Sequence, residues 1–477
     1  MTLASIEFAA FCAVLLVLYY RVPGHRQWTL LLLAGSLFSL GYGWRHFLLL
    51  LVTSVSAFLS ARAMEKNKAS LEKKEARKKN RRILAVCLGL NFGLLFFCKA
   101  SLLTCFSALP LGISFYTFQT MGYAIDVCRG TAAAEKDFLR FHLFASYFPL
   151  MVQGPICRHE QLAEQLLTEH KYDPKKVSFG LQRMLWGYFK KLVIADRIAP
   201  VVASLRMVED SAAAFFLLSL CYAVQIYGDF TGGIDVVLGL SQALGIELPE
   251  NFNLPFSAKS VAEFWRRWHI TLGEWMKRYV FYPISVSRPM LRLGKWTKNR
   301  WGLRGNRLAV YIATIMTWMA TGLWHGLTPN FLLWGMLNCA VILLEQQIPV
   351  RFSLPKGKGW DRLRMVRTFL LMNVIRACDL FPNPGDYFRA MTAGANFGAL
   401  SGKIPLTAAD YGVLAGGILL MAAMSRFQSR GRSVRRWLWR KPEWVRWGVL
   451  FGLFLVILLL GCYGVGYEET NFIYNQF

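Results

Sequence analysis

Long apolar stretches, separated by short basic or polar runs, dominate the chain. Each is long enough and apolar enough to be typical of a membrane-spanning helix or of a helical hairpin at membrane depth. The stretches lie at about 5–20, 28–43, 46–62, 83–98, 101–125, 178–205, 212–240, 308–345, 368–381, 408–424 and 447–465. This pattern predicts an all-α polytopic membrane protein, a multi-helix bundle of about 10–12 spans forming one domain over residues 1–477.

Two segments depart from the simple pattern of a span. Residues 109–119 place Pro110 and Gly112 inside an apolar stretch, which predicts a re-entrant or broken helix covered by protein or a water-filled cavity. Residues 264–285 place tryptophans on one face of a helical wheel and basic residues on the other. This second segment is therefore expected to be an interfacial amphipathic helix.

Composition and charge support the membrane interpretation. Hydrophobic residues make up 55% of the chain and charged residues only 17%, below the quarter that is usual in soluble domains. The net charge of +27 lies almost wholly in four runs that abut apolar stretches. These are residues 64–82, 286–308, 350–367 and 425–446, with net charges of +6, +7, +5 and +7. The positive-inside rule places these runs in the cytoplasm, where they contact anionic lipid of the bilayer. No soluble basic domain is visible in the sequence, so a nucleic-acid partner is not expected.

The sequence gives little support for a metal site or for redox chemistry. His159-Glu160 is followed at position 163 by Ala163, where a zinc protease needs its second histidine. The ten cysteines occur singly and are expected to be buried apolar residues. We therefore expect no metal site and no permanently bound cofactor.

Two histidines and two carboxylates are the candidate functional groups. His325 lies in the bend of the 308–345 hairpin, and an ionisable ring at membrane depth is costly enough to suggest function; a structural histidine at a turn is an equally good interpretation. His269 falls on the aromatic side of the 264–285 segment, with an interface anchor as its alternative. Asp229 and Asp235 suggest a lumen, or else interfacial acids beside packing glycines.

Several short motifs, taken in order, resemble the membrane-bound O-acyltransferase family, and its bacterial branch that acetylates alginate and other exported polysaccharides in particular. The most specific are the segments around the two histidines, which stand 56 positions apart. The motifs are Pro110-x-Gly112-Ile113-Ser114-Phe115-x-Thr117-Phe118-Gln119, Gly154-Pro155-Ile156-x-Arg158, Asp229-Phe230-x-Gly232, Pro249-Glu250-Asn251-Phe252-Asn253, Phe264-Trp265-Arg266-Arg267-Trp268-His269-Ile270-Thr271-Leu272 and Gly322-Leu323-Trp324-His325-Gly326.

The resemblance implies a helical bundle around a central tunnel, with catalytic residues His325 at the waist and His269 nearby. Residues expected to line the tunnel are Trp324, Trp268, Asp229 and Asn251. A histidine suits general-base catalysis near neutral pH, and His269 would orient the acyl donor or polarise its carbonyl. Four basic residues are expected to bind the phosphates of acetyl-CoA or of an acyl-carrier protein. An equally good interpretation is that they form the snorkelling basic face of an interfacial helix. The four residues are Arg266, Arg267, Lys277 and Arg278.

The C-terminal residues 466–477 resemble an aromatic tail motif of the family, and the last apolar stretch is expected to deliver them outside the cell. Tyr474 would accept the acyl group as an ester, with His325 activating its hydroxyl, and would pass it to an extracellular partner. The alternative is an aromatic belt that anchors the last span.

The function implied is O-acyl transfer, with acetyl favoured, from a cytoplasmic thioester across the bacterial plasma membrane to an extracellular polysaccharide. A separate extracellular acetyltransferase or the polymer itself is the expected partner. D-alanyl transfer to teichoic acid is the alternative within the class. A transporter or flippase using Asp229 and Asp235 is the alternative from another class, although the inverted repeat that it predicts is not visible.

Overall fold

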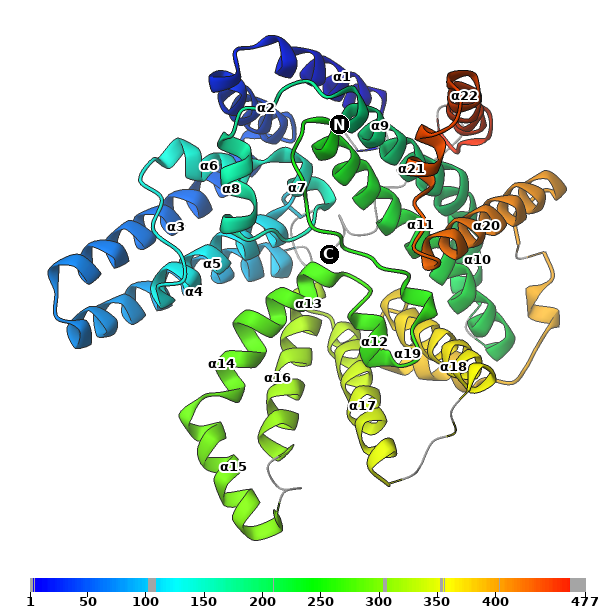
Figure 1. Cartoon of the computed structure of the whole chain (residues 1–477). Helices are drawn as coiled ribbons and strands as arrows, with labels where there is room; N and C mark the ends of the chain where they lie inside the picture. Colours follow the sequence, from blue (N-terminus) through cyan, green and yellow to red (C-terminus); the bar gives the residue numbers. More distant parts are fainter. Residues whose placement is uncertain are drawn as a thin grey trace.

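The computed structural model describes residue 3 and residues 5–101, 109–208, 210–302, 307–351, 355, 357–402 and 404–463. Helices make up the regular secondary structure of this part of the chain, together with one isolated antiparallel bridge between Phe252 and Trp268. The predicted all-α fold is confirmed. Helices from all parts of the sequence converge on the centre of the molecule in Figure 1, and their far ends extend outward.

The N-terminal third begins with two short helices and continues with a long hairpin. Its helices are α1 (Ile6–Arg21), η1 (Gly24–Arg26), α2 (Gln27–Gly41), α3 (Trp44–Ser70), α4 (Lys73–Ser101) and α5 (Ile113–Arg129). Helices α3 and α4 form the hairpin at the left of Figure 1, with the basic turn at its tip, and α5 packs against both. Helix α5 is buried from its first residue to Val127, as expected for a segment covered by protein.

The start of α5 explains the glycine of the Pro110–Gly112 sequence. Gly112 has φ of +70°, in the left-handed region that glycine adopts without strain. A Cβ atom there would lie 2.5 Å from the carbonyl oxygen of Met151. The chain therefore enters α5 at a close crossing with α7 (Phe148–Gln153).

The middle of the chain is built around α11, the longest helix. The elements are α6 (Phe138–Ser146), α7 (Phe148–Gln153), α8 (His159–Leu167), α9 (Pro174–Tyr188), the π-helix η2 (Phe189–Ala195), α10 (Asp196–Arg206) and α11 (Ala212–Ala243). Helices α9 and α11 approach closely at two pairs of glycines. A Cβ atom on Gly187 would lie 2.5 Å from the carbonyl oxygen of Gly232, and a Cβ atom on Gly239 would lie 2.5 Å from the carbonyl oxygen of Gly180. Small residues at helix crossings are typical of membrane proteins.

The remaining elements run from a broken segment to the C-terminal helices. They are η3 (Pro255–Ser257), α12 (Val261–Trp265), α13 (Ile270–Met276), the π-helix η4 (Lys277–Phe281), α14 (Tyr282–Ser285), α15 (Arg288–Trp301), α16 (Arg307–His325), α17 (Pro329–Arg351), α18 (Lys358–Arg376), η6 (Ala377–Leu380), α19 (Pro384–Thr392), η7 (Gly398–Leu400), α20 (Ala408–Ser429), α21 (Val434–Trp439) and α22 (Glu443–Leu460). Helices α16 and α17 form the hairpin predicted at 308–345. The basic run at 286–308 contains α15.

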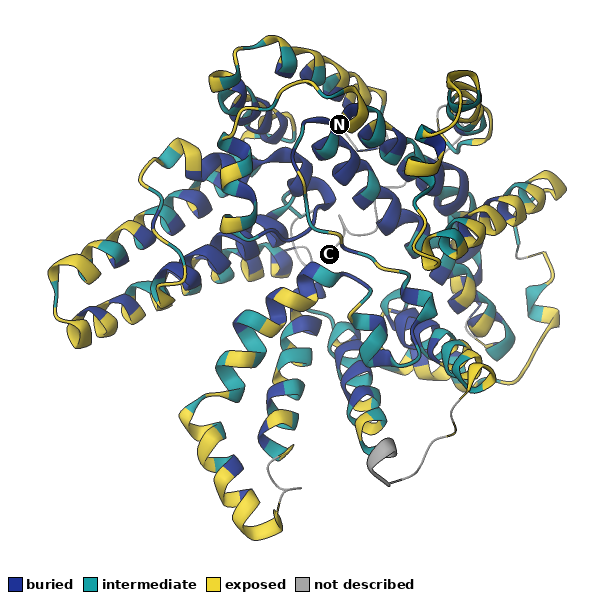
Figure 2. Cartoon of the chain, in the orientation of Figure 1, coloured by how far each residue is buried: buried dark blue, intermediate teal, exposed yellow. Residues whose placement is uncertain are grey.

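Five helices are long and apolar enough to cross a membrane by length and composition, namely α3, α4, α11, α20 and α22. The chain is therefore a membrane protein, and the predicted count of spans remains a prediction. Figure 2 shows buried residues gathered around the centre, and exposed residues along α15, α22 and the tip of the α3–α4 hairpin.

Candidate functional site

His325 is the last residue of α16, at the centre of the molecule. Its side chain is only 7% exposed. Aromatic rings surround it, with centroids 4.7 Å away for Trp334, 4.8 Å for Trp324 and 6.3 Å for Phe331, the last of these stacked. The following residue, Gly326, allows the ring of Phe331 to approach, because a Cβ on Gly326 would overlap that ring. The hairpin turn thus buries the histidine in an aromatic setting.

Lys99 of α4 binds the end of α16. Its ammonium group donates a hydrogen bond to the carbonyl oxygen of Trp324 and another, of 3.2 Å, to that of His325. It also lies 5.7 Å from the centroid of the Trp324 ring. The last carbonyls of a helix have no partner within the helix and carry partial negative charge, so a buried cation at this position fixes the backbone that carries His325.

His269 occupies a chain reversal between two short helices. Its backbone is left-handed, with φ of +49°, and its side chain is 1% exposed. The prediction of a continuous helix over 264–285 is therefore wrong at this point, because α12 ends at Trp265 and α13 begins at Ile270. Left-handed backbone is uncommon for residues other than glycine and is often found at functional sites.

Asn251 holds this reversal in place. Its Oδ1 accepts hydrogen bonds from the backbone N–H of Thr271 at 3.1 Å and from the Thr271 hydroxyl at 3.0 Å, and lies 3.4 Å from Nδ1 of His269. The Thr271 hydroxyl in turn accepts from the backbone N–H of Ile156 at 3.0 Å. Three sequence motifs, around Ile156, Asn251 and His269, meet in one buried network.

Trp324 joins the two histidines. The centroid of its ring lies 6.0 Å from that of His269 and 4.8 Å from that of His325. Phe118 packs on the same indole at 5.3 Å, and Phe230 contacts His269 at 5.0 Å. The structure therefore brings together both histidines, Trp324 and Asn251.

Trp268 faces a different neighbour. The guanidinium of Arg376 lies 4.3 Å from the centroid of its ring, in cation–π geometry, and Phe264 stacks on it at 5.6 Å. The contact between Trp268 and Arg376 thus joins α18 to the chain reversal at His269.

The two carboxylates of α11 are held in ion pairs. Asp229 accepts from Lys191 at 2.6 Å, and the same lysine binds Asp196 at 2.8 Å. Asp235 binds Arg183 at 2.8 Å and Lys190 at 2.7 Å. Both lysines come from the π-helix η2, which turns two successive lysines toward α11. Burial of an unpaired charge would be costly, so each of these carboxylates needs its cationic partner in the core.

A cavity of about 340 Å³ opens beside the broken helix. Its wall includes Lys277 and Arg278 of the four expected donor-binding residues, and Arg158 in addition. Arg266 and Arg267 are absent from this wall: Arg266 is exposed and Arg267 pairs with Glu263 at 2.7 Å. The cavity wall also includes Thr271, which links it to the network around His269.

Tyr279 and Arg278, both in the wall of this cavity, bind the carboxylate of Asp126. The Tyr279 hydroxyl donates to Asp126 at 2.6 Å, and Arg278 binds the same carboxylate at 3.1 Å. Burial, together with the hydrogen bond to Asp126, raises the pKa of the Tyr279 phenol. The cavity therefore presents a neutral tyrosine beside its cations.

The contacts described above do not bear on three of the sequence-based expectations, which concern the C-terminal tail, the central tunnel and a metal site. Tyr474 and residues 466–477 lie outside the described residues. The central tunnel stays a prediction, since neither His269 nor His325 is in the wall of the 340 Å³ cavity. In the described part of the chain, no group of three metal-binding side chains is found.

Sequence reasoning missed Lys99 and Arg376. Lys99 is a lone cation at the end of an apolar stretch, and such a residue is costly in a membrane unless it has a specific partner. That signal was available in the sequence. Arg376 gave no comparable signal, because the ring that it contacts lies more than a hundred positions away.

Comparison with known proteins gives the class of this site. Residues 128–296 match the model of the membrane-bound O-acyltransferase family. The matched segment contains His269 and Asn251 and ends before His325. Over these residues the chain is similar to the membrane-bound O-acyltransferase family, and the relatives that it resembles include alginate O-acetylases.

Three relatives illustrate the range of that family. The chain is 34% identical over 267 residues to the probable alginate O-acetylase of Azotobacter vinelandii, covering 56% of this chain and 50% of the relative. It is 29% identical over 304 residues to the peptidoglycan O-acetyltransferase of Helicobacter pylori, covering 57% and 54%. It is 29% identical over 239 residues to the teichoic acid D-alanyltransferase of Bacillus subtilis, covering 49% and 58%. The matches thus span about half the length of each relative.

Proposed function

We propose that the chain is an O-acyltransferase that moves an acyl group, with acetyl favoured, from a cytoplasmic thioester toward an extracellular polysaccharide. The observation that carries the proposal is the buried pair of histidines joined by Trp324, with Lys99 fixing one and Asn251 the other. The family match and the names of the relatives support acyl transfer as the chemistry.

His325 acts as the general base in this proposal. One ring nitrogen takes the proton of an incoming hydroxyl as its oxygen forms a bond to the thioester carbonyl carbon. The carbon–sulfur bond then breaks, and the leaving thiolate takes the proton back from the imidazolium. His269, whose ring also contacts Trp324, would orient the acyl donor or polarise its carbonyl by donating a hydrogen bond to the oxygen as negative charge develops there. Burial in aromatic surroundings keeps water from competing with the hydroxyl.

The donor would approach through the 340 Å³ cavity. Arg158, Lys277 and Arg278 line it and suit the phosphates of acetyl-CoA or of the phosphopantetheine arm of an acyl-carrier protein. The hydroxyl of Thr271, in the cavity wall, donates a hydrogen bond to Oδ1 of Asn251, and the same oxygen contacts the ring of His269. These contacts connect the cavity wall to His269 and support donor binding at this cavity.

The acceptor side is proposed from the relatives and the tail sequence. The names of the relatives include acetyl transfer to alginate or peptidoglycan and D-alanyl transfer to teichoic acid. Acetyl transfer is favoured because the alginate O-acetylase match has the higher identity of the three. Tyr474 would carry the acyl group to an extracellular acetyltransferase or directly to the polymer. The proposed location is the plasma membrane of a bacterium.

The deciding experiment measures O-acyl groups released from the cell envelope by mild base and identified by mass. Wild type is compared with His325→Ala and His325→Gln, at equal protein levels in the membrane. His25→Ala serves as the control, because His25 is an exposed histidine in η1. Loss of acetate in both His325 variants and not in the control is expected.

Other outcomes would each revise the proposal. Loss of D-alanine in place of acetate would keep the mechanism and change the acyl group. Unchanged ester content in both His325 variants would contradict the role of His325 and favour transport. The paired state of Asp229 and Asp235 gives that alternative no specific support.

A further inference from the structure

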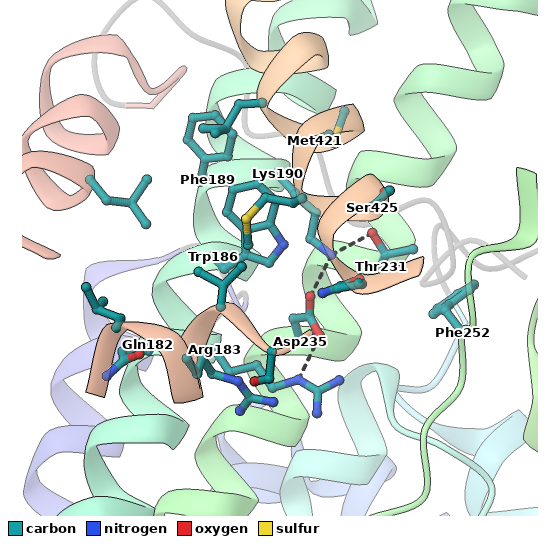
Figure 3. Close-up of a pocket in the computed structure, with 18 of the residues that line it drawn as sticks. Gln182, Arg183, Trp186, Phe189, Lys190, Thr231, Asp235, Phe252, Met421 and Ser425 are labelled. Atoms are coloured by element: carbon teal, nitrogen blue, oxygen red, sulfur yellow. Dashed lines mark hydrogen bonds and ion pairs between the residues drawn. The ribbon is translucent and has the colours of Figure 1, made fainter. Parts of the chain in front are cut away.

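A second and larger cavity, of about 680 Å³, lies between α9 and α11 on one side and the C-terminal helices α20, α21 and α22 on the other. Neither His269 nor His325 lines it. Figure 3 shows this cavity, with Phe189 and Trp186 beside Lys190 and Thr231, and with Arg183 and Asp235 below them. Its volume is in the range of about 300–1,000 Å³ typical of small-molecule sites. The acyl-transfer proposal makes no use of this cavity.

The core side of the cavity carries a self-contained ion network. Arg183 binds Asp235 through Nε at 2.8 Å and Glu250 through its two terminal nitrogens at 2.7 and 2.6 Å. Lys190 completes the network with contacts of 2.7 Å to Asp235 and to the Thr231 hydroxyl. The two carboxylates in the cavity wall are therefore already neutralised by these two cations.

Two further cations line the cavity without a counter-charge. Among the described residues, Arg432 and Arg435 form no ion pair with a carboxylate. Arg435 is held in position by hydrogen bonds to Gln242 at 2.7 Å and to the carbonyl oxygen of Phe179 at 3.3 Å. The cavity wall thus carries a positive excess of two charges at the end formed by α21.

The rest of the wall is mostly apolar. It includes Trp186, Phe189, Met421, Leu450, Leu453 and Val456. The polar arginine end and the apolar wall together give the cavity an amphipathic lining. An occupant that satisfies both must combine an anionic group with a hydrocarbon chain.

The surroundings of the cavity are those of a membrane surface. Helices α20 and α22 are candidate spans with little buried surface, so they border on lipid. Trp437 of α21 and Trp444 and Trp447 of α22 are exposed, and exposed tryptophans mark the headgroup level of a bilayer. Residues 425–446 form one of the strongly basic runs, which the positive-inside rule places at the leaflet rich in anionic lipid.

We propose that this cavity binds one anionic phospholipid, with its phosphate between Arg432 and Arg435 and an acyl chain along the wall formed by α20 and α22. The lipid would fill the space between the C-terminal helices and the α9–α11 core. It would act as a structural ligand that is distinct from the acyl donor and the acceptor.

Native mass spectrometry of the full chain in detergent tests the charge requirement. Phosphatidylglycerol and phosphatidylcholine of the same acyl composition are titrated separately. Arg432→Gln/Arg435→Gln is compared with Arg436→Gln/Arg440→Gln, which removes the same charge from the same basic run at residues outside the cavity wall. We expect the first pair to weaken phosphatidylglycerol binding by about tenfold or more, to the level of phosphatidylcholine, and the control pair to leave it unchanged.

A second pair of variants tests the apolar wall without altering charge or the Arg435 hydrogen bonds. Leu453→Trp places bulk in the cavity, whereas Leu459→Trp adds the same bulk to α22 at a side chain that is 74% exposed. Only Leu453→Trp is expected to reduce the number of bound phosphatidylglycerol molecules by one.

Three results would overturn the proposal. Equal losses in the two arginine pairs would show diffuse attraction to a basic surface. Equal effects of the two tryptophan variants would show that no acyl chain enters the cavity. Binding of sn-glycerol 3-phosphate as tightly as the lipid would show a site for free phosphate compounds.

Discussion

The ammonium group of Lys99 lies 3.2 Å from the backbone carbonyl oxygen of His325. The contact joins α4 to the last residue of α16, two helices separated by more than two hundred positions in sequence. It fixes the backbone that carries the imidazole. Lys99 is therefore a positioning residue.

Lys99→Met is expected to reduce acyl transfer by about ten- to a hundredfold, since hydrogen bonds from a charged group contribute roughly 1.5–3 kcal/mol. The methionine keeps most of the side-chain volume, so the protein should still accumulate in the membrane. Turnover at saturating donor should fall while the KM for the donor stays near that of wild type.

Lys78→Met is the matched control for this change, because Lys78 is an exposed lysine of the same helix. Equal losses of activity in the two variants would contradict a positioning role for Lys99.

Asn251→Ala is expected to lower both activity and thermal stability. Its Oδ1 accepts two hydrogen bonds from Thr271, and leaving such buried donors unsatisfied costs about 1–3 kcal/mol each. A lower midpoint of thermal unfolding in detergent, together with reduced acyl transfer, checks this. Asn253→Ala changes an exposed asparagine of the same motif and should alter neither quantity. A fully active and stable Asn251→Ala protein would show that the reversal at His269 does not depend on this side chain.

Gly322→Ala is expected to separate the two arms of the α16–α17 hairpin. The added methyl group would lie 2.5 Å from the carbonyl oxygen of Phe331, and relief of such overpacking costs about 1–3 kcal/mol. Thermal stability in detergent should fall, and acyl transfer with it. At Gly89 of α4 a methyl group would meet no atom within 4 Å, so Gly89→Ala should be neutral or slightly stabilising. Equal effects at the two positions would show that the hairpin tolerates wider spacing.

Lys277→Gln is expected to raise the KM for the acyl donor several-fold with little change in turnover, because Lys277 lines the 340 Å³ cavity. The change removes a charge that attracts phosphate before the chemical step. Kinetics with acetyl-CoA and with an acylated carrier protein would show which donor responds. Arg266→Gln, measured in parallel, removes a charge outside that cavity. A larger effect of Arg266→Gln would move the donor site to the exposed face of the broken helix.

Tyr474→Phe is expected to abolish acylation of the envelope polymer if the tail carries the acyl group, because only the phenolic oxygen is lost. The direct observation is an acyl ester on the C-terminal peptide of wild type, detected by mass spectrometry. Tyr467→Phe serves as the control in the same tail. Normal polymer acylation by Tyr474→Phe would end the relay proposal.

Periodicity and composition could predict much of this fold. The apolar stretches at 28–43 and 408–424 correspond to α2 and α20 within a few residues, and the hairpin at 308–345 corresponds to α16 and α17. These elements follow from local apolar pattern, which is the strongest signal in a sequence. The motif spacing also identified both histidines.

The broken segment at 264–285 could not be predicted in the same way. Its helical wheel is amphipathic, yet the chain reverses at His269 because Asn251, a residue of a different segment, binds Thr271 after the break. The contacts of Lys99 with α16 and of Arg376 with Trp268 likewise depend on how distant segments pack. Tertiary contacts of this kind override local pattern and leave little trace in a single sequence.

Helix α4 runs without interruption from Lys73 in the basic turn to Lys99 and Ser101 beside the histidine. At 1.5 Å per residue, Lys73 and Lys99 are about 40 Å apart. A rod of this length transmits a tilt at one end to the other. A molecule that tilts α4 by docking on its basic turn would therefore move the ammonium group that binds the backbone carbonyl of His325, without entering the donor cavity.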